Sequence, residues 1–193
     1  MTRIAMTSAF VLASVSLWPA ELVWAQTASP YAGEQKRVIK ALSIKDVDDL
    51  MQGRGMGLAK VAELNRYPGP MHGLELAEPI KLSREQQDAL TAIMARMSSE
   101  AKALGAAIVD LERELDAAFA ARTIDHRRMQ ELTELIGVKQ GAIRSVHLAA
   151  HLETAAALSS EQIAQYDVLR GYSGIGAAPV PEPVHGGHGK SKH

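Results

Sequence analysis

A long apolar repeat between residues 84 and 121 constrains the fold more than any other feature of this sequence. Its members are spaced alternately four and three residues apart over four heptads. They are Leu90, Met94, Met97, Ala101, Leu104, Ile108, Leu111, Leu115 and Ala118. Such spacing places every member on one side of an α-helix and is typical of helices that pack lengthwise against a partner. The sequence therefore predicts one long helix with a single apolar seam.

A second helical pattern follows a short break at residues 122–125 and runs to about Ala157. Its apolar stripe is broader than the first. The stripe consists of Met129, Leu132, Leu135, Ile136, Val138, Ala142, Ile143, Val146 and Ala150. Because the break is short, the two helices are expected to form an antiparallel hairpin.

The hairpin also predicts a register between its helices. Residues equally distant from Thr123 should lie at the same height, which pairs Gly105 with Gly141. A glycine inside a helix costs up to about 1 kcal/mol relative to alanine, so two glycines at one height suggest a close approach of the two backbones. The same register makes Glu100 the carboxylate expected nearest to His147.

The composition favours an all-α fold and excludes several classes of protein. The chain is 47% hydrophobic but only 4% aromatic, so it has few of the residues that populate sheets. The absence of cysteine excludes disulfide scaffolds, thiolate nucleophiles, iron–sulfur clusters and cysteine-type zinc sites. A net charge of −1 argues against a nucleic-acid partner and against a polybasic membrane-surface protein.

The first 25 residues have the pattern of a signal peptide. Arg3 precedes an apolar run, and Val23-Trp24-Ala25 fits the small-residue rule of a cleavage site. The run is too short to span a hydrocarbon core of about 30 Å and is broken by Pro19. We therefore expect cleavage near Ala25-Gln26, a periplasmic location and no stable membrane insertion of the mature chain.

Three parts of the chain follow from these patterns. Residues 1–25 are the signal peptide, and residues 26–172 form one helical domain. Residues 173–193 hold glycine, proline and three histidines with no apolar period, so a disordered tail is expected there.

Glycine and proline separate short helical patterns between Tyr31 and Ile80. One pattern begins at Ser43, which Asp46 follows at the spacing of a capping box. Glycines at positions 53, 55 and 57 interrupt it, and because no strand precedes them they indicate a helix break and not a nucleotide-binding loop. The residues Tyr67-Pro68-Gly69-Pro70 end the next short pattern.

The length of the first hairpin helix predicts a homodimer. A helix over residues 84–121 extends for ~57 Å. A compact monomer of this size is only ~40 Å across. The residues that precede the hairpin are too few to wrap it, so one of its faces should contact a second subunit or a bound client.

Two short motifs precede helices in corresponding ways. Leu82-Ser83-x-x-Gln86 opens the hairpin, and Leu158-Ser159-x-x-Gln162 opens the terminal helix. In both, the serine can cap the third amide of the helix and the glutamine can return the bond. These motifs and their placement resemble the LTxxQ-motif family of Spy/CpxP-like periplasmic proteins, with serine in place of threonine. That broad superfamily includes periplasmic heavy-metal sensors.

The resemblance carries expectations about fold and function. Members of this family are four-helix chains that pair into curved, intertwined dimers. The resemblance implies ATP-independent binding of unfolded envelope proteins, or adaptor and sensor roles in envelope stress and metal response. The residues themselves predict helices, export and dimerisation, and they say nothing about chaperone activity.

Metal binding is the one chemistry that the side chains suggest. His147 and His151 lie one turn apart on one helix face, where two imidazoles can bind Ni, Co, Cu or Zn if other ligands converge. His72, next to Met71, is a further candidate ligand. The alternative explanation is a pair of interfacial histidines bonded to neighbouring carboxylates or backbone, because two ligands do not make a site.

The sequence therefore predicts a non-enzyme, since no nucleophile elbow and no H-E-x-x-H motif is present. The first functional hypothesis is a chaperone-like protein that binds unfolded or partly folded envelope proteins and requires no cofactor. One alternative is a heavy-metal sensor or resistance protein that binds a divalent transition metal through His147 and His151. A second alternative is an inhibitory adaptor of a sensor kinase.

Overall fold

The computed structural model describes residues 28–172, and these residues form helices and no strand. The elements are η1 (Glu34–Lys36), α1 (Ile44–Met51), α2 (Lys60–Glu63), α3 (Pro70–Glu75), α4 (Arg84–Ala120), α5 (His126–Ala157) and α6 (Ser160–Leu169). Residues 28–33 belong to a separate unit that contains one turn, closed by a bond from the Ala32 N–H to the Ser29 carbonyl. The all-α prediction is confirmed. The predicted signal peptide and tail lie outside the described residues.

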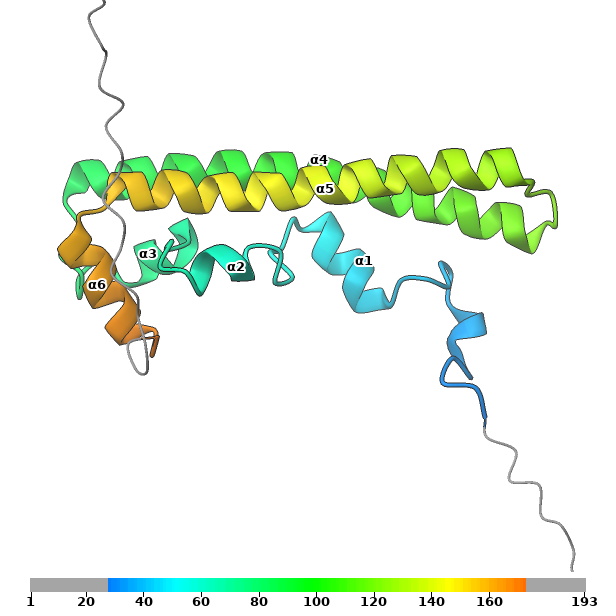
Figure 1. Cartoon of the computed structure of the whole chain (residues 1–193), viewed down its shortest axis with the longest axis horizontal. Coiled ribbons are helices and arrows are strands. Elements are labelled where there is room, and N and C mark those ends of the chain that lie inside the picture. Colours follow the sequence, from blue (N-terminus) through cyan, green and yellow to red (C-terminus); the bar gives the residue numbers. More distant parts are fainter. Residues whose placement is uncertain (1–27, 173–193) are drawn as a thin grey trace, which may run out of the picture. The chain divides into compact units, whose positions relative to one another are not determined.

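Helices α4 and α5 form the long antiparallel hairpin (Figure 1). The chain reverses at residues 121–125, where Arg122 has a left-handed backbone with φ 55°. Ion pairs join Arg96 to Glu153 near the open end and Arg128 to Glu114 near the turn. Both pairs agree with the register predicted from the sequence, because their members lie about equally far from the turn.

Both predicted capping motifs are present. Ser83 accepts a hydrogen bond from the Gln86 amide, and the Gln86 side chain accepts one from the Ser83 amide. Ser159 and Gln162 make the same reciprocal bonds at the start of α6. These bonds satisfy N–H groups that the first turn of a helix leaves without partners.

The two capping glutamines also bind each other. The Gln86 side-chain amide donates to Gln162 Oε1 at 2.8 Å, and the Gln162 amide donates to Gln86 Oε1 at 2.9 Å. Gln86 donates further to the carbonyl of Ala157 at 2.9 Å, at the end of α5. The two sequence motifs therefore form one contact, which fixes the start of α4 against the start of α6.

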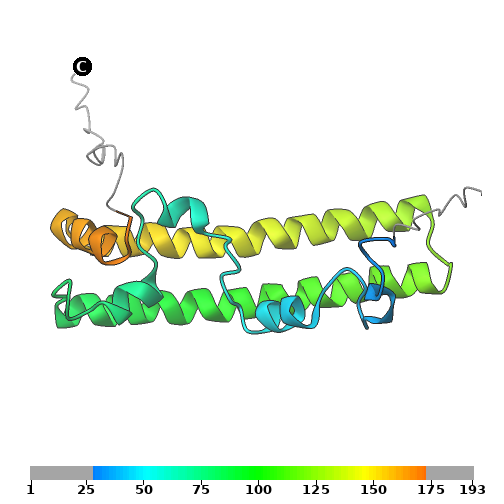
Figure 2. The ribbon, with the colours of Figure 1, turned by 90° about the horizontal axis from the view of Figure 1, so that it is seen from below.

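The residues before the hairpin lie across one face of it (Figures 1 and 2). We call residues 37–82, which include α1, α2 and α3, the covering segment. Helix α1 packs on α4, α2 packs on α5, and α3 contacts both. The short helices predicted between Tyr31 and Ile80 are thus confirmed, but Pro70, expected in a helix break, begins α3, where a proline at the first position leaves no N–H unpaired.

The apolar core has two parts. The first lies under α1 and contains Ile39, Leu50, Ala101, Ile108, Val109 and Ile143. The second lies at the open end of the hairpin and contains Ile80, Leu82, Leu90, Leu158 and Tyr166. The α4 seam faces these clusters, whereas Leu135 and Val138 of the predicted α5 stripe are exposed. The period of α5 identified its apolar residues but not which of them would be covered.

The predicted contact between Gly105 and Gly141 is wrong. A Cβ added at Gly105 would lie 2.0 Å from the carbonyl oxygen of Leu50, so this glycine admits the backbone of α1 and not that of α5. Gly141 faces open space, with nothing within 4 Å of an added Cβ. A close backbone approach does account for Gly105, but the backbone that approaches it belongs to the covering segment.

These two glycines predict opposite effects of one substitution. Gly105→Ala should lower the free energy of unfolding and displace α1, because the methyl group and the Leu50 carbonyl cannot occupy the same space. Gly141→Ala should raise the free energy of unfolding by about 0.5–1 kcal/mol, because alanine favours an exposed helix position. Urea unfolding followed by circular dichroism measures both. Equal effects would contradict the assignment of Gly105 to the α1 contact.

The glutamine contact can be separated from helix capping. Gln86→Glu keeps an acceptor for the Ser83 amide but removes the donors to Gln162 and Ala157, so it should lower the free energy of unfolding by about 1–3 kcal/mol. Ser83→Ala, which removes the cap alone, should cost about 1 kcal/mol. Urea unfolding of the two variants gives both values. A neutral Gln86→Glu would show that the paired amides do not contribute.

Candidate functional site

His147 and His151 lie on the side of α5 that the covering segment covers. A Cβ added at Gly55 would lie 4.0 Å from Cε1 and Nδ1 of His147, and one at Gly69 would lie 3.0 Å from Cε1 and Nε2 of His151. The residue His147 is 4% exposed, and the side chain of His151 is 12% exposed. Each imidazole is therefore covered by a loop, and at His151 the absence of a side chain on Gly69 lets the backbone pass close to the ring.

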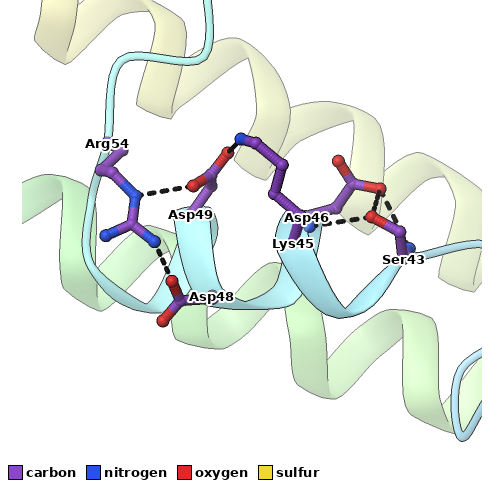
Figure 3. A network of polar contacts seen from close by, with 6 residues as sticks. All are labelled: Ser43, Lys45, Asp46, Asp48, Asp49 and Arg54. Carbon is purple, nitrogen blue, oxygen red and sulfur yellow. Dashed lines mark hydrogen bonds and ion pairs between the residues drawn. The ribbon is translucent and has the colours of Figure 1, made fainter.

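Arg54 anchors the loop that passes over His147 (Figure 3). Its Nε donates to Asp49 Oδ1 at 2.6 Å, and its Nη2 pairs with Asp48. Lys45 pairs with the other oxygen of Asp49. The bonds from Lys45 and then Arg54 hold the pKa of Asp49 below its usual range, so this buried carboxylate stays charged. The network ties the loop back onto α1 and fixes its path over the histidine.

The ring of His151 is held in one orientation by the backbone. Its Nδ1 lies 2.7 Å from the carbonyl oxygen of Tyr67, and because a carbonyl only accepts, Nδ1 carries the hydrogen. Glu63 Oε2 lies 3.7 Å from the same nitrogen. In a neutral ring this arrangement leaves the lone pair on Nε2. Histidines that ligate metals commonly have this arrangement, with the second nitrogen bonded to a carbonyl or carboxylate.

His147 has a buried nitrogen without a partner. Its Nε2 makes no hydrogen bond to any of residues 28–172. Burial lowers the pKa of His147, and the nearby His151 lowers it further, so the ring is neutral at pH 7. A buried polar atom without a partner costs about 1–3 kcal/mol, and this nitrogen has the chemistry to bind a metal ion or accept a hydrogen bond.

The candidate metal ligands do not form a complete site. His72 lies on α3, and its Nδ1 is 2.8 Å from Glu75 Oε2 of the same helix. Across the described part of the chain, no three histidine, aspartate or glutamate side chains gather in a group that could hold a metal ion. His147 and His151 supply two nitrogens of suitable chemistry, whereas a stable zinc site needs three or four protein ligands.

Glu63 is the residue that the sequence reasoning missed. Its Oε1 accepts hydrogen bonds from the hydroxyl groups of Tyr166 at 2.6 Å and Tyr172 at 3.2 Å, and Arg170 Nε lies 3.5 Å from the same oxygen. Together with His151 these residues form what we call the Glu63 cluster. Burial and the bond to Glu63 raise the pKa of Tyr166, which keeps its hydroxyl protonated. No local sequence signal distinguishes Glu63 from other helix carboxylates.

Glu100 does not take the role predicted for it. It lines a surface groove of about 130 Å³ between α4 and α5, whose lining residues include Met97, Val146 and Ala149. The carboxylate close to the histidine pair is Glu63, which reaches His151 from the covering segment. The hairpin register alone could not reveal a ligand that comes from outside the hairpin.

His147 should make the protein sensitive to mild acid. Because its pKa is lowered in the folded state, the unfolded state binds more protons below pH 6.5, and stability falls as the pH drops through this range. The loss for one such group is at most about 1.4 kcal/mol per pH unit. Urea unfolding at pH 7.5 and 5.5 should show a smaller loss in His147→Leu than in the wild type. Gln140→Ser, an exposed change on the same helix, should keep the wild-type loss, and an unchanged loss in His147→Leu would contradict this assignment.

Comparison with known proteins gives one match. No curated protein and no solved structure matches the chain. The family described as heavy-metal resistance matches residues 56–165, which is more than half of the 193 residues. The matched region includes α2 to α5, His147, His151 and both L-S-x-x-Q motifs. It ends inside α6 and leaves out the last residues of that helix. The chain therefore belongs to the heavy-metal resistance family, within the Spy/CpxP-like LTxxQ superfamily of periplasmic proteins.

Proposed function

We propose that this protein binds unfolded or partly folded envelope proteins in the periplasm, without ATP and without catalysing a reaction. The observation that supports this proposal is the number of large apolar side chains left exposed on all parts of the fold. They include Met51, Val61, Leu64, Met71, Phe119, Leu135, Val138, Leu152, Val168 and Leu169. Exposed methionine and aliphatic side chains can re-pack and so suit weak contacts with many unrelated clients.

Electrostatic attraction contributes little to this proposal. Arg54, Arg127 and Arg128 each pair with carboxylates of the chain. Lys60 and Arg144 make no ion pair with a described residue. Client binding would therefore depend mainly on apolar contacts, which gives low affinity and rapid release.

The proposal includes a homodimer. Helix α4 has 37 residues and α5 has 32, and the covering segment packs on only one face of their hairpin. Pairing with a second copy along the face of the hairpin that the covering segment leaves open would agree with the length argument from the sequence.

An aggregation assay tests the client-binding proposal. The protein should suppress the light scattering of a chemically denatured client without ATP. The double variant Leu135→Ser, Val138→Ser should need several-fold more protein for the same suppression, because it removes exposed apolar contacts. Gln140→Ser, an exposed change on the same helix, is the matched control. Absence of suppression by the wild type, or equal suppression by the double variant, would contradict the proposal.

Metal binding is a second candidate function, supported by the unpartnered Nε2 of His147 and by the fixed ring of His151. Here the two histidines would hold a divalent transition metal. Among residues 28–172 no third histidine, aspartate or glutamate joins them in a metal-binding group, so the remaining ligands would be of another kind. Titration calorimetry with Ni²⁺, Cu²⁺ and Zn²⁺ distinguishes this candidate. Binding that is lost when both histidines are changed to alanine supports it, and binding unaffected by that change contradicts it.

A further inference from the structure

Helix α6 covers the second apolar cluster of the core. Beneath it lie Ile80 and Leu82 of the covering segment, Leu90 of α4, and Leu158. Tyr166 of α6 is fully buried among them. If α6 moved away as a unit, these side chains would become accessible while the rest of the hairpin kept its own contacts.

Polar contacts with α2 and the residues that follow it hold α6 in this position. Tyr166 and Tyr172 both donate to Glu63 Oε1, at 2.6 and 3.2 Å. Arg66 Nε donates to Asp167 Oδ2 at 2.6 Å. All of these bonds join residues far apart in the sequence. They connect α6 and Tyr172 to the covering segment, whereas the Gln86–Gln162 contact joins only the start of α6 to the hairpin.

The docked position of α6 leaves a buried carboxylate oxygen without a hydrogen bond. Asp167 is 5% exposed, and its Oδ1 is buried without a hydrogen-bond partner among the described residues. Arg66, which pairs with its other oxygen, has a left-handed backbone with φ 68°. The unpaired oxygen of Asp167 favours release, because a buried polar atom without a partner adds free energy to the closed state.

Helix α6 is also too short to be stable alone. It has 10 residues, whereas isolated helices shorter than about 12–15 residues are marginal in water. Its capping box and its contacts therefore maintain it only while it is docked. The hairpin helices, with 37 and 32 residues packed along their length, do not depend on α6 in the same way.

We propose that α6 is a detachable helix, held closed by the bonds of Tyr166 and Tyr172 to Glu63, and that its release uncovers the second apolar cluster while the hairpin stays folded. The docked helix then acts as an autoinhibitory cover. This proposal rests on the proposed client-binding function in one respect: the uncovered cluster would add apolar surface for clients. The opening itself does not depend on that function.

Hydrogen exchange measured by mass spectrometry tests the opening. Tyr166→Phe keeps the buried ring and removes only the donor to Glu63. Amide hydrogens of residues 160–169 should then exchange about 10- to 100-fold faster, the range for one charge-assisted hydrogen bond, while those of residues 101–118 keep their wild-type rates. Tyr67→Phe is the matched control, because Tyr67 takes part in the site through its carbonyl oxygen. Glu63→Gln should act in the same direction as Tyr166→Phe.

The fluorescence of a dye that binds apolar surfaces gives a second, client-free measurement. It should rise several-fold in Tyr166→Phe and stay at the wild-type level in Tyr67→Phe. The proposal is wrong if α6 exchanges no faster than in the control, if α6 and the hairpin accelerate equally, or if faster exchange brings no rise in dye binding. If exchange and dye binding both rise but aggregation suppression stays the same, the detachable helix stands and its link to client binding is contradicted.

Discussion

Close backbone approach between the covering segment and the hairpin determines where every candidate functional group lies. Gly105 of α4 admits the Leu50 carbonyl, and Gly69 and Gly73 of the covering segment lie against His151 and Leu90. A side chain at Gly105 would push the two layers apart, and one at Gly69 or Gly73 would displace the side chain it meets. Because the layers are this close, His147 is buried, His151 is largely covered, and Glu63 of α2 lies near His151. The site is thus a product of the contact between layers and not of one helix.

Much of the fold could be predicted because its signals are local. The heptad seam, the break near Arg122 and the capping residues Ser43, Ser83 and Ser159 all act within a few residues, and all were identified from the sequence. The contacts of the covering segment could not be predicted in this way. Helical periodicity shows that a residue is apolar on one face, but not which neighbour covers that face. For this reason Leu135 and Val138 were expected in the core and lie exposed.

The site was only half predictable for the same physical reason. His147 and His151 share a helix face by spacing, which any helix imposes. Glu63 comes near His151 through the path of the chain between α1 and α3, and that path depends on left-handed residues, the Arg54 network and the glycine contacts together. The hairpin register predicted a carboxylate from the facing helix, Glu100. In the structure the carboxylate near His151 is Glu63 of the covering segment.

The position of Glu63 links the two candidate functions of the protein. One of its oxygens lies near His151, and the other accepts the hydroxyl groups that hold α6. A carboxylate has a limited number of lone pairs, so a change in its contacts on one side alters the geometry available on the other. Glu63 is thus the one carboxylate that lies near the His151 ring and also accepts the hydroxyl groups of Tyr166 and Tyr172 among the described residues. Its position follows from the contact between the covering segment, α5 and α6, and no single helix determines it.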